Sequence, residues 1–200
     1  MKKKLALAML ALSLSSGLWA EAKLLFQLDA SSSTLVASAM KNETKTVKVM
    51  FPSLSGSLDL ATGKASVTTE LSGLQTGDPW RDSNIKQLFF NITMKASFGQ
   101  ASFSWTGKPA ELAGLKTDKP QSTVLKGELN LHGTKTVLSG PAVLTLLADG
   151  SYKASFSDWI VDIKQVQMAS SLAKLNKYCP KPHRVANEVK LSGDLVFRQK

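Results

Sequence analysis

Residues 125–135 read LKGELNLHGTK, and this stretch decides the fold class. Apolar or small residues occupy every second position from Leu125 to Leu131, and polar residues fill the positions between them. Because side chains of a β-strand alternate between the two faces of a sheet, this run predicts a strand with one buried face. The segment His132-Gly133-Thr134-Lys135 then predicts a tight hairpin turn.

The same period of two recurs along the chain and predicts about eight strands in all. The other alternating segments are 23–28, 46–51, 54–60, 66–71, 101–106, 152–157 and 188–198. Further hairpin turns are predicted at Ala61–Lys64 and Asp149–Ser151. A meander of this length avoids exposed edges by closing into a barrel or by pairing two sheets. The polar residues of the alternating segments predict an outer face in contact with water, and their apolar residues predict an inner face.

Two segments have helical rather than strand spacing. Residues 82–89 predict a short helix with Asp82 as its N-cap. Residues 163–177 predict a longer helix, which the prolines after it end. Whether that helix lies beside the barrel or caps one end is open at this point. Residues 108–121 are predicted to be a loop, and with no repeat or linker residues 23–200 form a single domain.

The first 22 residues predict a signal peptide rather than part of the fold. Lys2–Lys4 are followed by an apolar run at Leu5–Leu14 and by the small-residue cleavage pattern Ala20-Glu21-Ala22. An N-terminal anchor helix is the alternative, but the apolar run is too short to span a bilayer. We therefore expect export to the periplasm, and secretion from the cell is the alternative destination.

The overall composition bounds the classes of function. A chain of 200 residues with 43% hydrophobic residues and 20% charged residues forms a core, which excludes a disordered chain and a polytopic membrane protein. The net charge of +10 comes mostly from scattered lysines, which indicates a solvated surface or attraction to anionic headgroups. Export argues against a nucleic-acid partner.

Sequence motifs of the common enzyme and nucleotide-binding classes are absent, and we predict no catalysis and no cofactor. Cys179 and His183 are the one pair that suggests chemistry, as a nucleophile with its base or as two metal ligands. No orienting acid is close to them in sequence, and two ligands are too few for a zinc site. His132 is interpreted as a turn residue.

The stretch from Leu74 to Phe90 carries the most specific motif. Its elements are Leu74, Thr76-Gly77, Arg81-Asp82 and Phe89-Phe90. In this stretch the chain resembles the YceI-like family of exported lipid-binding proteins. Residues 127–135 are similar to the family's Gly-x-Leu-x-Leu-x-Gly-x-x-Lys hairpin, except that Lys135 comes one residue early. The order of elements matches across residues 24–198.

The resemblance implies an all-β fold, an eight-stranded antiparallel lipocalin-like barrel, to which the residue spacing adds one short and one longer helix. It also implies that the lumen binds a polyisoprenoid, an isoprenoid quinone or a fatty-acid-like lipid without catalysis. Small inward residues among large ones leave room for a tunnel; they are Ala37, Ala39, Ala65, Ala101 and Ala154. The residues expected to contact the ligand are Leu71, Phe89, Phe90, Phe103, Trp105, Leu129, Leu131, Phe156 and Arg81.

Several alternatives stay open at the level of sequence. Arg81 either meets an anionic headgroup or pairs with a carboxylate across the barrel mouth. A filled barrel would instead make the protein a periplasmic interaction partner of a membrane redox protein or a cell-envelope complex. Contact with a membrane surface and a homodimer are further expectations. The family's His-Ser pair after the first Asp is absent, since Asp29 precedes Ala30 here, so the ligand's identity is open.

Overall fold

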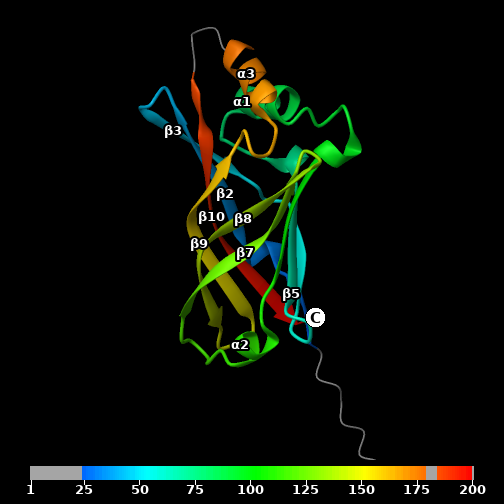
Figure 1. Cartoon of the computed structure of the whole chain (residues 1–200), viewed down its shortest axis with the longest axis vertical. Helices are drawn as coiled ribbons and strands as arrows, with labels where there is room; N and C mark the ends of the chain where they lie inside the picture. Colours follow the sequence, from blue (N-terminus) through cyan, green and yellow to red (C-terminus); the bar gives the residue numbers. More distant parts are fainter. Residues whose placement is uncertain (1–23, 179–183, 200) are drawn as a thin grey trace, which may run out of the picture.

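The structure, a computed structural model, describes residues 24–178 and 184–199. Its strands form one antiparallel sheet that closes into a barrel (Figure 1). The strands are β1 (Leu25–Leu28), β2 (Thr34–Lys41), β3 (Lys45–Met50), β4 (Leu54–Asp59), β5 (Lys64–Glu70), β6 (Gln100–Thr106), β7 (Gln121–Leu131), β8 (Thr134–Leu146), β9 (Tyr152–Asp162) and β10 (Val185–Gln199). The helices are α1 (Pro79–Asn84), α2 (Pro109–Ala113) and α3 (Ala169–Tyr178), with short 3-10 or π-helical turns at Ala30–Ser32, Leu71–Gly73, Ile85–Phe89 and Ala96–Phe98.

The ring closes at β1, which pairs with both β4 and β10. On β1, Phe26 lies opposite Leu58 of β4 and opposite Gln199 of β10. The closed order is β1-β4-β5-β6-β7-β8-β9-β10, and all of these pairings are antiparallel. The predicted eight-stranded antiparallel barrel is therefore confirmed.

Strands β2 and β3 extend the wall beyond this ring. β10 pairs with β1 near its C-terminal end, whereas its portion from Val185 to Asp194 pairs with β2. β3 pairs with β2 and forms a hairpin with it. The chain passes from β1 to β2 through the 3-10 turn at Ala30–Ser32, which is N-capped by Asp29. β1 and β2 therefore pair with two successive parts of the same edge of β10.

Two strands were absent from the alternating segments of the sequence. β2 and β8 have small residues at inward positions, including Ala37 and Ala39 on β2 and Gly140 and Ala142 on β8. Their outward positions include apolar residues, such as the exposed Val137. Small residues inside and apolar residues outside remove the contrast on which an alternation pattern depends.

The helix boundaries also differ from the prediction. α1 begins at Pro79 rather than at Asp82, because Asp78 is the N-cap and accepts hydrogen bonds from the amides of Trp80 and Arg81. The prediction for residues 163–177 was too long, since the chain turns through 163–168 before α3 begins.

The segment 108–121, which was predicted to be a loop, contains the helix α2. Lys108 precedes Pro109, which occupies the first turn of α2, and Leu112 is buried. α2 lies at one end of the barrel, and α1 and α3 lie together at the opposite end, called here the α3 end (Figure 1). The longer helix therefore caps the barrel. In residues 24–178 and 184–199, none of the helices has the length and apolar character needed to cross a membrane.

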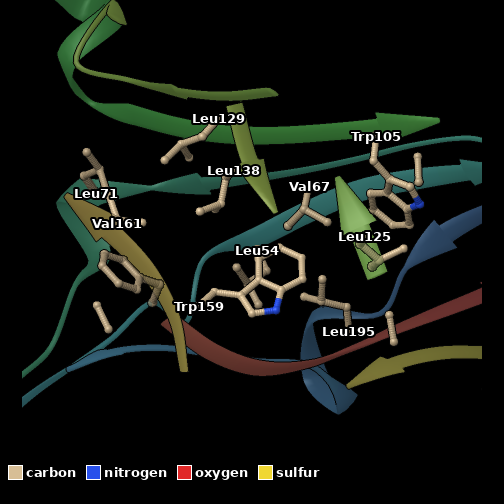
Figure 2. Close-up of a cluster of buried hydrophobic side chains, with 14 of the residues drawn as sticks. Leu54, Val67, Leu71, Trp105, Leu125, Leu129, Leu138, Trp159, Val161 and Leu195 are labelled. Carbon is tan, nitrogen blue, oxygen red and sulfur yellow. The ribbon is translucent and has the colours of Figure 1, made fainter. Parts of the chain in front are cut away.

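The apolar core fills much of the barrel interior. Figure 2 shows Leu54, Val67, Leu129 and Leu138 extending from their strands toward a shared interior, with the indole of Trp159 among them. Leu71, Leu74, Val166, Met168 and Phe197 are almost completely buried. Burial of apolar surface of this kind is the main favourable contribution to folding.

A network of polar side chains links the C-terminal end of β10 to the segment after β1 and to the turn between β8 and β9. Arg198 donates from Nε to Asp29 Oδ2 at 2.7 Å and from Nη1 to Asp149 Oδ2 at 2.9 Å. Asp29 also accepts hydrogen bonds from Ser31 Oγ at 2.6 Å and Ser32 Oγ at 2.8 Å. The two serine hydroxyls are the main cause that holds the pKa of Asp29 well below its usual range.

We expect Asp29→Asn to lower the melting temperature at pH 7, measured by circular dichroism. Because the pKa of Asp29 is depressed in the folded state, its stabilisation is complete above the unfolded pKa and is lost as the pH falls toward the folded value. The difference in melting temperature between the two proteins should therefore narrow below about pH 4. Glu188→Gln, at an exposed position, is the control. Equal melting temperatures of Asp29→Asn and wild type at pH 7 would contradict this account.

Candidate functional site

A cavity of about 140 Å³, called here the inner cavity, lies within the barrel. Its wall is almost wholly apolar and is built by inward residues of most strands of the ring together with the turn after α1. Representative residues are Val67, Trp105, Leu125, Leu138 and Leu195. Thr69 and Ser102 are the polar residues of this lining, and so predominantly apolar a wall is suited to an apolar guest.

A second cavity of about 150 Å³, the outer cavity, lies at the α3 end. The hairpin of β2 and β3, the segment from α1 through the π-helical turn, and α3 provide its wall. Unlike the inner cavity it includes charged side chains, those of Lys41 and Arg81, and it also includes the amide of Asn84. The charged groups of the lining therefore lie at one end of the barrel.

The two cavities are neighbours along the barrel. Six residues line both of them: Ala37, Phe51, Phe89, Phe90, Ile163 and Val189. Phe89 and Phe90 contact each other edge to face, with ring centroids 4.8 Å apart. These six residues form the constriction between an apolar interior and a more polar outer chamber.

Aromatic rings of the interior pack directly against glycines of the wall. A Cβ atom at Gly127 would overlap the ring of Phe103, and one at Gly140 would overlap the indole of Trp159. Trp159 is also held by a hydrogen bond of 2.7 Å from its Nε1 to the carbonyl of Pro141. Each ring occupies space that a side chain at the glycine would otherwise fill.

The structure brings all nine predicted ligand-contact residues to the two cavities. Six of them line the inner cavity: Leu71, Phe103, Trp105, Leu129, Leu131 and Phe156. Phe89 and Phe90 line both cavities, and Arg81 lines the outer one. Of the small residues expected to leave space, Ala37, Ala39 and Ala101 line a cavity, whereas Ala65 and Ala154 are buried in the core away from both.

Sequence analysis missed the part of the wall that follows Ser157. The alternation breaks there because β9 has a bulge opposite Ser192, with Asp158 in the left-handed region at φ 55°. After the bulge, Trp159, Val161 and Ile163 all face the inner cavity. A search that allowed one extra residue after Ser157 would have found this second alternating run.

The motif between Leu74 and Phe90 acts through local hydrogen bonds. Thr76 donates to Asp82 Oδ1 from its amide at 2.7 Å and from its hydroxyl at 2.6 Å. Gly77 has φ +79°, a conformation that favours glycine, and Asp78 caps α1. The motif thus fixes the start of the helix whose far end carries Phe89 and Phe90 into the cavities.

Arg81 does not pair with a carboxylate across the mouth. It forms a salt bridge with Asp78, three residues earlier, at 3.2 Å, and its side chain is 33% exposed. Near it, Asn84 Nδ2 is buried and has no hydrogen-bond partner among the described residues. Thr69 Oγ1, on the wall of the inner cavity, is buried in the same way. Buried polar groups without partners are costly, so both can bind a polar atom of a guest.

Among the described residues, the charged side chains that line the cavities are Lys41 and Arg81. His132 lies in the turn between β7 and β8 at φ 54° and stacks on Phe98, as expected for a turn residue, and burial lowers its pKa. Cys179 and His183, the predicted pair, lie outside the described residues. Within the residues that are described, no group of three His, Cys, Asp or Glu side chains is arranged to hold a metal ion.

Comparison with known proteins agrees with this architecture. The sequence model of the YceI-like domain matches residues 26–197. The chain belongs to the YceI-like family. A search of curated protein sequences finds no significant match.

Several solved structures share this fold. A polyisoprenoid binding domain from Saccharophagus degradans superposes with a TM-score of 0.81 at 20% identity, over 89% of this chain and 100% of that one. BcnA from Burkholderia cenocepacia gives a TM-score of 0.57 at 15% identity, over 84% and 98% of the two chains. A mutant YceI protein from Campylobacter jejuni gives 0.54 at 17% identity, over 78% and 86%.

Gly140 provides a test of how the cavity wall is built. In Gly140→Ala the new methyl group displaces the indole of Trp159, so we expect the free energy of unfolding to fall by about 1–3 kcal/mol. The measurement is urea denaturation followed by tryptophan fluorescence. Gly107→Ala is the matched control, because a Cβ there has no neighbour closer than 3.9 Å. Equal effects of the two substitutions would argue against the proposed packing.

Proposed function

We propose that this protein is an exported, periplasmic, non-catalytic binder or carrier of a long-chain amphiphile. The observation that carries the proposal is the pair of neighbouring cavities, predominantly apolar within the barrel and lined by charged residues only at the α3 end. An amphiphile has the same distribution of polarity. The export pattern at residues 1–22 supports the location, and these residues lie outside the described part of the chain.

The size of the cavities bounds the ligand. A dry cavity of about 150 Å³ in a protein admits a molecule as large as benzene, so the two cavities together hold a chain of about a dozen carbons. Burial of such a chain contributes about 10 kcal/mol before the cost of association is subtracted. A longer tail would have to move the rings of Phe51, Phe89 and Phe90 at the constriction.

The polar end of the ligand belongs in the outer cavity. Lys41 and Arg81 offer positive charge there, and Asn84 offers an amide donor without a partner among the described residues. These donors suit the phosphate, carboxylate or quinone oxygens of an amphiphile. The Saccharophagus degradans relative is described as a polyisoprenoid binding domain, which makes isoprenoids the first ligands to test.

The filled-barrel interaction protein is the weaker hypothesis. It requires side chains to pack the lumen completely, whereas the inner cavity leaves about 140 Å³ empty. Eight-stranded barrels either fill their interior or hold one small ligand, and this interior supports the second case.

Ala37 provides the sharpest test, because it is buried and lines both cavities. We expect Ala37→Phe to block the constriction and to weaken binding of farnesyl phosphate at least tenfold. Lipid-free refolded protein is titrated with farnesyl phosphate, and fluorescence of the lumen residues Trp105 and Trp159 reports binding. A tenfold loss corresponds to about 1.4 kcal/mol.

A second lumen variant and an exterior control keep this test decisive. Ala101→Phe fills the inner cavity from another strand, and Val137→Phe adds the same ring to an exposed position. Both lumen variants should bind weakly while the exterior variant binds like the wild type. Unchanged affinity in both folded lumen variants, or the absence of any bound lipid in native mass spectra of protein from its own host, would overturn the proposal.

A further inference from the structure

Two exposed aromatic side chains from different helices meet at the α3 end. Trp80 of α1 and Tyr178 of α3 stack with ring centroids 6.1 Å apart and an interplanar angle of 27°. Trp80 is 53% exposed and Tyr178 57%, whereas Trp105 and Trp159 are buried. Large aromatic residues held in water are costly, and Trp and Tyr are the residues enriched where proteins meet the headgroup region of a bilayer.

The exposed face of α3 combines this aromatic pair with positive charge. Leu172 is buried and Leu175 lines the outer cavity, whereas Lys174, Lys177 and Tyr178 lie on the exposed side of the helix. The helix sequence ASSLAKLNKY contains no acidic residue. This is the composition of a helix face that contacts an anionic bilayer surface, with aromatic groups beside lysines.

Several cations elsewhere on the molecule form ion pairs. The ion pairs of the barrel wall and of the α2 end are Lys108–Glu111, Lys135–Glu128, Lys153–Asp194, Lys190–Asp158 and Arg198 with Asp29 and Asp149. At the α3 end the cations are Lys41, Lys45, Arg81, Lys86, Lys164, Lys174, Lys177 and Arg184, and the acids are Glu43, Asp78, Asp82, Asp162 and Glu188. Of these acids, Asp78 pairs with Arg81 and Asp82 bonds to Thr76. The cations of this end therefore outnumber its acids, and Lys174 and Lys177 form no ion pair with a described residue.

The aromatic pair also marks where the outer cavity reaches the surface. Trp80 lines the outer cavity and is half exposed, and Arg81 beside it lines the same cavity. A surface that held Trp80 and Tyr178 would therefore lie against the cavity opening. Because the lysines, the aromatic pair and the cavity opening lie at one end, the protein would meet such a surface in a single orientation.

We propose that the α3 end docks onto an anionic lipid bilayer through Trp80, Tyr178, Lys174 and Lys177. In the docked state the two rings lie among the headgroups, and the lysines face the anionic lipid surface. The opening of the outer cavity then faces the membrane. This docking depends on the exterior of the protein alone and does not require a ligand in the lumen.

The test uses the purified protein and sedimentation with lipid vesicles. Vesicles of phosphatidylcholine alone are compared with vesicles in which about a third of the lipid is phosphatidylglycerol. We expect binding to the anionic vesicles only, and a decrease as salt is added. Each lysine near an anionic surface contributes electrostatic free energy to membrane binding. The double substitution Lys174→Glu with Lys177→Glu should therefore weaken binding at least about tenfold. Trp80→Ala should weaken it as well.

A matched charge reversal separates position from net charge. Lys116→Glu with Lys119→Glu makes the same change of charge at exposed positions beyond α2, at the opposite end. This control should bind anionic vesicles nearly as well as the wild type. Equal loss in both double variants, or equal binding to neutral and anionic vesicles, would overturn the proposal. Capture of an acidic protein by Lys174 and Lys177 without vesicle binding would assign the face to a protein partner and would also overturn it.

The lumen variants distinguish this proposal from the proposed ligand binding. Ala37→Phe should still bind anionic vesicles, because its change is internal. The Lys174→Glu and Lys177→Glu double variant should still bind farnesyl phosphate, because neither lysine lines a cavity. Loss of vesicle binding with intact ligand binding, or the reverse, identifies which of the two proposals fails.

Discussion

β10 is the strand that closes the barrel, because both of its edges are paired. β10 pairs with β9 along one edge and with β1 and β2 in succession along the other, and this pairing closes the sheet. Closure removes the free edges of the ring and turns every second side chain toward one shared interior. The network of Arg198 with Asp29 and Asp149 lies at the seam, where the first and last strands meet.

Closure alone does not decide whether the interior is full. An eight-stranded ring has room for either packed side chains or one small guest, so the sizes of the inward residues decide. Here large and small residues are paired: Phe103 lies over Gly127, and Trp159 lies over Gly140. The two rings occupy space next to the wall glycines, and two cavities of about 140 and 150 Å³ stay empty. The same amount of aromatic side chain placed opposite bulkier residues would fill the barrel.

The α3 end has features that packing of the core does not explain. The loop fixed by Thr76 and Asp82 sets the start of α1, and the chain after α1 carries Phe89 and Phe90 between the two cavities. The charged lining residues, the exposed Trp80 and Tyr178, and Lys174 and Lys177 all lie at this end. The opposite end has α2 with the buried Leu112 and a local Lys108–Glu111 pair. The end with α2 is therefore closed by a buried apolar residue and a local ion pair, whereas the α3 end has the composition of a contact surface.

Alternation within single segments predicted the all-β fold class and the inward residues around Phe103 and Leu129, because alternation depends only on neighbouring residues. The eight-stranded barrel was implied by the resemblance to the YceI-like family. Alternation missed β8, where the inward Gly140 and Ala142 are small, and it missed Trp159, because the bulge at Asp158 reverses the alternation. The position of α3 at the end of the barrel and the two cavities of the lumen became visible only in the folded chain. Empty volume is set by how rings from distant strands rest on glycines of their neighbours, and no local pattern in one segment records that contact.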